Sequence, residues 1–161
     1  MGGQHALQHP GRVASLTLLE PVMVLHGMPL GVYVWGSVLI LPFPQPWKDW
    51  ALAEIGGVTI EEIRERTPVS VMIDEGSKQY VSTTLRPRTF TDSEWQSMKM
   101  PIRVEIASDK SMAGGQPAAD RARALGIGHV TVRADTTHSL PMQAAAELGP
   151  ELQAYWTAHD R

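Results

Sequence analysis

Short apolar runs alternate with helical patterns at both ends of this chain. Residues 13–19 (Val-Ala-Ser-Leu-Thr-Leu-Leu) are mostly apolar and lie between a Pro-Gly and a Glu-Pro pair, which predicts a strand buried on both faces. Near the other end, strands are predicted over 101–107 and 130–134, an Ala-rich helix over 116–125 and a closing helix over 142–156. Strands that alternate with helices in this way indicate parallel βαβ units, so the predicted fold class is α/β.

The segment that follows the first strand is apolar and uncharged over much of its length. No Asp, Glu, Lys or Arg occurs from Pro21 to Trp47, and residues 22–41 are largely apolar. A membrane span needs about 20 such residues. This stretch, however, contains residues that break a continuous helix, namely Gly27, Pro29, Gly31 and Gly36. We therefore favour a buried or substrate-facing apolar lid over a membrane span.

Later residues of the same segment carry helix start and stop signals. A helix is predicted over 48–55, closed by Gly56-Gly57. A second helix is predicted to begin after Thr59, which precedes an acidic first turn. The run 91–94 (Thr-Asp-Ser-Glu) has the spacing of a capping box and predicts a further start. Because the segment 22–99 is far longer than an ordinary loop, it is predicted to be a mainly helical insert.

Composition narrows the function classes. The chain has 161 residues, which suits one domain, and a formal net charge of −3 with Lys and Arg scattered along it. It therefore lacks a basic stripe, and no nucleic-acid partner is expected. Without cysteine it has no disulfide, thiolate metal site or cysteine nucleophile, which suits a reducing compartment. No secretory leader pattern is visible, and a cytoplasmic location is expected.

The first residues resemble the continuation of a catalytic motif. The run Met-Gly-Gly-Gln-His-Ala-Leu-Gln-His-Pro-Gly-Arg-Val over 1–13 is similar to the segment that follows the nucleophile in the α/β-hydrolase family, where a Gly-x-Ser-x-Gly turn leads into a helix. The resemblance implies that a nucleophilic serine directly precedes Met1 and that the Met1 backbone N–H serves the oxyanion hole. It also implies that Gly2 and Gly3 permit a close approach of helix and strand, which a side chain at Gly2 would block.

His138 is the strongest candidate for acid–base chemistry. It lies in Thr-Thr-His-Ser-Leu-Pro-Met over 136–142, after a predicted strand and before the last helix. This segment is similar to the histidine loop of the same family, and the resemblance implies that His138 is the general base. An imidazole suits that task because it can take the nucleophile's proton near neutral pH and return it to the leaving group. The alternative is a polar loop histidine without a role.

Two acidic residues compete for the task of orienting His138. After the strand over 101–107 the family commonly has Gly-x-x-Asp, whereas this chain has Ser-Asp-Lys-Ser, which places Asp109 one residue early. Glu20 ends the strand over 13–19, and some family members, dehalogenases among them, place the acid at the end of that strand. The resemblance implies that Asp109 or Glu20 stabilises the imidazolium. The alternatives are a solvated loop aspartate and a surface or helix-capping glutamate.

The resemblance as a whole implies a partial α/β-hydrolase fold, divided into a core fragment over 1–21, a lid over 22–99 and a C-terminal core over 100–161 that carries the acid and histidine loops. It implies esterase-like hydrolysis of a small ester or related apolar substrate, by a chain that lacks the nucleophile and is expected to be inactive alone. No cofactor and no metal are implied. His5 and His9 share one helical face but have no third ligand.

Two other functions remain open. The first is a non-catalytic remnant or interaction module that docks an exposed sheet edge onto another chain, with a homo-oligomer as one form of this. The second, weaker alternative is a small membrane-anchored protein that uses residues 22–41.

Overall fold

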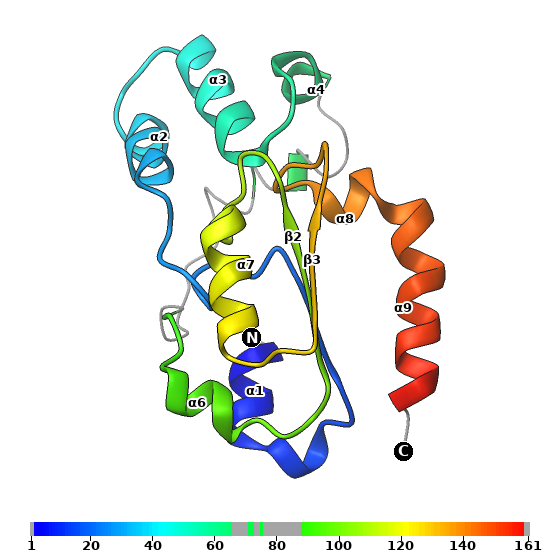
Figure 1. Cartoon of the computed structure of the whole chain (residues 1–161). Coiled ribbons are helices and arrows are strands. Elements are labelled where there is room, and N and C mark those ends of the chain that lie inside the picture. Colours follow the sequence, from blue (N-terminus) through cyan, green and yellow to red (C-terminus); the bar gives the residue numbers. More distant parts are fainter. Residues whose placement is uncertain (1, 66–70, 73–74, 76–87, 160–161) are drawn as a thin grey trace.

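A three-stranded parallel sheet forms the centre of the computed structural model, which describes residues 2–65, 71–72, 75 and 88–159 (Figure 1). The strands are β1 (Leu16–Leu19), β2 (Ile102–Ala107) and β3 (His129–Arg133), in the spatial order β1-β2-β3. In this register Leu16 lies opposite Ile102, and Arg103 lies opposite His129. The predicted α/β class with a parallel sheet is confirmed.

Helices cover both faces of this sheet. The helices α1 (Gly2–Gln8) and α7 (Gly115–Ala124) pack on one face, and α9 (Ala145–His159) lies on the other (Figure 1). Successive residues of β2 face opposite sides. Val104 and Ile106 belong to the apolar cluster under α1 and α7, whereas Ala107 belongs to the cluster under α9.

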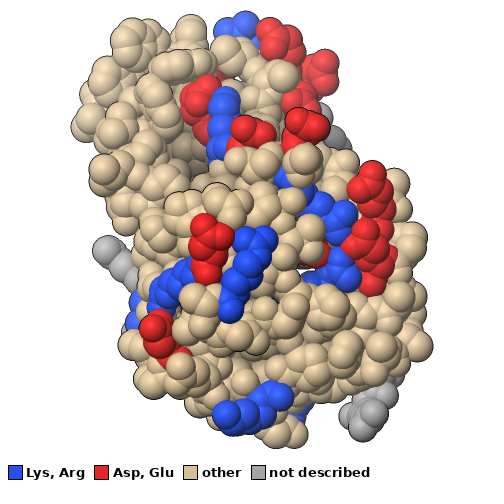
Figure 2. All heavy atoms as spheres, in the orientation of Figure 1, with Lys and Arg blue, Asp and Glu red and all other residues tan. Residues whose placement is uncertain are grey.

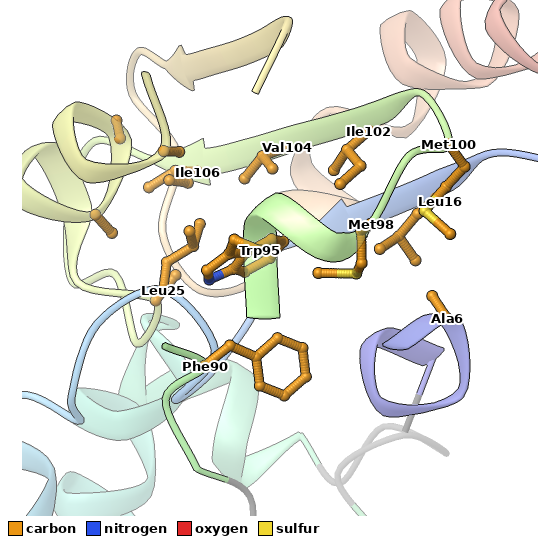
Figure 3. Packing of buried hydrophobic residues seen from close by; sticks show 14 residues of the cluster. Ala6, Leu16, Leu25, Phe90, Trp95, Met98, Met100, Ile102, Val104 and Ile106 are labelled. Carbon is orange, nitrogen blue, oxygen red and sulfur yellow. The ribbon is translucent and has the colours of Figure 1, made fainter. Parts of the chain in front are cut away.

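The larger apolar core lies between β2 and the helices α1, α6 (Asp92–Ser97) and α7 (Figure 3). Phe90 and Trp95 meet there with ring centroids 5.5 Å apart. Ile106 and Leu25 are fully buried in the same cluster. Burial of one such side chain contributes about 1.5–3 kcal/mol relative to leaving it in water.

A buried charge network lies on the α9 side of the sheet. Glu105 of β2 has no exposed surface, and it is paired with Arg103 at 2.7 Å and with Arg133 at 2.8 Å. Both guanidinium groups also reach Glu151 on α9. A buried carboxylate needs such partners, since an unpaired one would carry a large desolvation cost. The network therefore fixes α9 on the sheet.

Among the helices that the structure fully describes, three follow β1 and lie over the end of the sheet at which the strands finish; we call them the cap helices (Figure 1). They are α2 (Leu30–Ile40), α3 (Gln45–Gly56) and α4 (Ile60–Arg64). The predicted stop of α3 is confirmed, because Gly57 adopts a left-handed conformation with φ of 65° and donates its N–H to Ala53 O. The predicted helix start after Thr59 and the predicted capping box at Thr91 are confirmed as well, and Thr59 also forms a capping box with Glu62.

Several predicted boundaries are wrong. The first strand begins at Leu16 and not at Val13, because it pairs with β2 only from Ile102 onward, and the short helix η1 (Pro10–Arg12) occupies the turn before it. The closing helix predicted over 142–156 is divided at Ala144 into α8 (Leu140–Gln143) and α9. Pro141 fits because it lies in the first turn of α8, where its missing N–H is tolerated.

The uncharged stretch forms a short helix with an exposed apolar surface. Leu30 and Ile40, at the ends of α2, are 81% and 87% exposed. These side chains are therefore not buried, and the alternative of a substrate-facing lid stays a prediction. Figure 2 shows no Lys, Arg, Asp or Glu on the upper left part of the molecule, where α2 lies. Among the helices that the structure describes, none is long and apolar enough to cross a membrane.

Candidate active site

Two of the predicted site residues meet at the end of the sheet where the strands finish. His138 lies in the turn between β3 and α8, and its Nδ1 is 3.2 Å from Oε2 of Glu20. Glu20 directly follows β1, at a backbone φ of 46°, which is uncommon for a residue with a side chain. Parallel strands bring their carboxyl ends to one edge, so residues 118 positions apart in the sequence become neighbours.

The Glu20 carboxylate is buried and closely held. It is 4% exposed, and its Oε1 accepts the Ala107 N–H at 2.6 Å and the Ser111 hydroxyl at 2.8 Å. Its Oε2 accepts the N–H groups of Met112 at 3.1 Å and Ala113 at 3.4 Å. A buried carboxylate with several N–H and O–H donors is stabilised in its charged form. Both readings of Glu20 as a surface or helix-capping glutamate are therefore wrong.

The electrostatics favour an ionised Glu20. Burial raises the pKa of the Glu20 carboxyl, but the hydrogen bonds from His138, the Ala107 amide and Ser111 lower it by more, so the pKa lies below its ordinary value. An ionised carboxylate only accepts hydrogen bonds. We therefore assign the proton of neutral His138 to Nδ1, which leaves the lone pair on Nε2 for a reacting group.

The histidine loop is fastened to the C-terminal end of α3. Thr137 Oγ1 donates to Gly57 O at 2.8 Å, and Ser139 Oγ donates to Gly56 O at 2.9 Å. The approach is so close that a Cβ on Gly57 would lie 2.6 Å from Thr137 Oγ1. These contacts hold the residues on either side of His138, so the position of its ring depends on the cap helices.

Asp109 does not join this group. Its side chain is exposed, and its Oδ2 accepts a hydrogen bond from the Ser108 hydroxyl at 2.7 Å. Its backbone N–H donates to Thr136 O at 2.9 Å, which ties the loop after β2 to the loop after β3. The next residue, Lys110, forms an ion pair with Glu54 of α3 at 2.9 Å. The structure thus brings together His138 and Glu20, and it leaves Asp109 on the surface.

The three residues that are implied to follow the nucleophile, Met1, Gly2 and Gly3, differ in what the structure shows. Met1, the predicted oxyanion donor, lies outside the described residues. A Cβ on Gly2 would meet no described atom within 4 Å, and the expected clash with the strand before the nucleophile stays a prediction. A Cβ on Gly3 would lie 3.3 Å from the Phe90 ring, a tight contact that a small shift of the ring would relieve. Packing of α1 against the core is the physical reason for this difference, since Gly3 is buried and Gly2 is exposed.

The donors around Glu20 were not predicted from the sequence. They come from the loop over 107–113, which precedes Gly114 and Gly115, both with positive φ. The glycine pair with a nearby serine hydroxyl is a weak signal for a tight loop that turns its N–H groups inward.

Within the described part of the chain, no group of three or more His, Asp or Glu side chains is placed to hold a metal ion.

Comparison with solved structures identifies the fold. The naproxen esterase (carboxylesterase NP) of Bacillus subtilis matches with a TM-score of 0.74 and 17% identity over 96% of this chain. Carboxylesterase CesB of the same organism matches with a TM-score of 0.72 and 18% identity over 94% of this chain. A meta-cleavage product hydrolase matches with a TM-score of 0.68 and 16% identity over 98% of this chain. The chain therefore has part of the α/β-hydrolase fold, as predicted.

The match is to a part of each larger structure. This chain spans 55% of the length of each of the two carboxylesterases and 62% of the meta-cleavage product hydrolase. No protein-family model and no curated protein sequence matches it.

Proposed function

We propose that this chain supplies the histidine and the acid of a serine-hydrolase triad that cleaves a small ester or related apolar substrate. The observation that carries the proposal is the 3.2 Å contact between His138 Nδ1 and the buried Glu20 carboxylate. This is the relation of base and orienting acid that triad chemistry requires. The esterase fold of the structural neighbours supports the reaction class.

In this mechanism the unprotonated Nε2 of His138 takes the proton of a serine hydroxyl as that oxygen attacks the substrate carbonyl. The imidazolium then gives the proton to the leaving alcohol, and water repeats the sequence on the acyl-enzyme. Glu20 holds the tautomer and stabilises the imidazolium, while remaining ionised. The cap helices serve as the lid over the substrate, and no step needs a cofactor.

The nucleophile is the element that the described residues do not supply. Following the resemblance of residues 1–13, we propose that the serine directly precedes Met1 in the active protein and that the Met1 N–H helps to form the oxyanion hole. Loss of a triad serine costs about six orders of magnitude in kcat. The chain over 1–161 is accordingly expected to be inactive by itself.

The test uses the native gene product, purified from its host. Its intact mass is measured, its serine is labelled with a fluorophosphonate, and hydrolysis of p-nitrophenyl butyrate is followed. We expect a mass above 17.7 kDa and a labelled serine next to Met1. A native mass of 17.7 kDa without labelling would refute the catalytic proposal.

Matched variants then test which carboxylate orients His138. We expect Glu20→Gln to lower kcat/KM by about 10²–10⁴-fold, because the imidazole loses its orienting charge. Asp109→Asn, the same change at an exposed carboxylate, is expected to leave kcat/KM almost unchanged. The reverse pattern would assign the acid to Asp109.

The second candidate function is that of an interaction module. It is favoured by β1, which is paired with β2 on one edge and with no described strand on the other. Such an edge can pair with another chain, including a second copy. Light scattering coupled to size exclusion at several concentrations tests this: a folded, inactive dimer supports the module, and a monomer at all concentrations contradicts it.

A further inference from the structure

Ser111 is joined to the acid of the site by a hydrogen bond that the proposed triad does not use. Its hydroxyl donates to Glu20 Oε1 at 2.8 Å and accepts the Gly115 N–H at 3.0 Å. With one acceptor and one donor in place, the direction of the hydroxyl proton is fixed. We infer that Ser111 is a positioning residue, whose hydroxyl holds the Glu20 carboxylate so that Oε2 faces His138 Nδ1. This inference rests on the proposed function, since it matters for catalysis only if Glu20 serves His138.

The two carboxylate oxygens have separate sets of donors. Oε1 is held by the Ala107 amide and by Ser111, whereas the hydrogen bond with His138 is made by Oε2. Oε2 accepts from two backbone amides and faces the imidazole. Without the Ser111 hydroxyl, Oε1 keeps a single donor, and the carboxylate gains freedom to rotate about its Cγ–Cδ bond. Together with the backbone amides, the charge-assisted hydrogen bond from Ser111 therefore fixes the plane of the carboxylate in which one oxygen faces His138.

A purely structural role is the competing explanation, because Ser111 also binds the first amide of α7. That role predicts a loss of stability without a change at Glu20. The positioning role predicts a change at the Glu20 carboxyl and at the His138 Nδ1 proton. Ser108 offers a matched control, since its hydroxyl binds Asp109 and lies three residues earlier in the same loop.

The experiment is NMR on the chain over 1–161, with ¹³C-labelled glutamate carboxyls and ¹⁵N-labelled histidine. In Ser111→Ala we expect the Glu20 titration midpoint to rise, because a hydrogen bond to its charged form is lost. We also expect the His138 Nδ1–H signal to broaden through faster exchange with water. In Ser108→Ala both signals should stay at their original positions. An unchanged Glu20 midpoint in Ser111→Ala, or an equal change in Ser108→Ala, would overturn the inference.

A second pair of variants decides the matter if Ser111→Ala does not fold. Thr and Val have the same shape and differ in the hydroxyl, so Ser111→Thr should keep the Glu20 midpoint and Ser111→Val should raise it. Equal midpoints in these two variants would again overturn the inference.

The proposed function is judged separately. If the native protein hydrolyses esters, Ser111→Ala should lower kcat by about tenfold with KM unchanged, because Ser111 touches the acid and not the substrate. If no hydrolysis is found, the proposed function fails, while the Glu20 midpoint still decides whether Ser111 positions the carboxylate.

Discussion

Replacement of Gly57 by alanine tests whether α3 is packed against the histidine loop as closely as the structure shows. Gly57 has a φ of 65°, which costs an alanine about 1–2 kcal/mol. The new Cβ would also lie 2.6 Å from Thr137 Oγ1. Overlap of this kind in a packed region costs about 1–3 kcal/mol more. We therefore expect Gly57→Ala to lower the free energy of unfolding by about 2–5 kcal/mol.

Gly126→Ala is the control for this prediction. Gly126 has a similar φ of 77°, and a Cβ there would meet no described atom within 4 Å. This variant should therefore show the backbone cost alone, about 1–2 kcal/mol. Urea denaturation followed by tryptophan fluorescence gives both values, and thermal midpoints should differ by about 2–4 °C for each kcal/mol between them. Equal losses in the two variants would refute the close approach of Gly57 and Thr137.

Two further predictions concern the core and the pH dependence of stability. Ile106→Ala should lower the free energy of unfolding by about 2–5 kcal/mol, because Ile106 is fully buried; a loss below 1 kcal/mol in urea denaturation would contradict its packing. Hydrogen bonds from Arg88 and the Thr91 amide lower the pKa of Glu94 from 4.5 to about 2. The ionised Glu94 carboxylate therefore stabilises the fold fully above about pH 4.5, and this stabilisation is lost as the pH falls through about 2. Carboxyl ¹³C NMR should show the low midpoint in the wild type and a higher one in Arg88→Met, and equal midpoints would refute the pairing.

The sequence predicted the order of the elements better than their ends. The caps at Thr59 and Thr91 could be predicted because a capping box is a local pattern of two side chains and the intervening backbone. The start of β1 could not, since it depends on where β2 begins to pair with it. Pro29 was expected to interrupt a continuous helix, and α2 begins only after it, at Leu30. Gly31 and Gly36 were expected to do the same, yet both lie within α2. Proline disrupts the interior of a helix and is tolerated at its start.

The candidate site could be predicted only in part, because some of its features are local in the sequence and others depend on tertiary packing. His138 was found from a local motif, and Glu20 from its place at the end of a strand. The choice between Glu20 and Asp109 depends on which carboxylate the loop over 107–113 encloses, and that is a matter of tertiary packing. The backbone amides that hold Glu20 have no side-chain signature, so only the loop geometry reveals them.

The attachment of α3 to the histidine loop limits how the cap can move. A displacement of the end of α3 by about 1 Å would stretch both hydroxyl–carbonyl bonds beyond hydrogen-bond range. The C-terminal end of α3 is therefore held in place by the histidine loop. An opening motion that leaves His138 in place has to keep the end of α3 docked. If α2 moved alone it would have to leave α3, where its Trp35 ring meets Trp50 with centroids 4.4 Å apart. The end of α3 and the residues beside His138 thus form one unit, so a cap that moved as a whole would carry the candidate base with it.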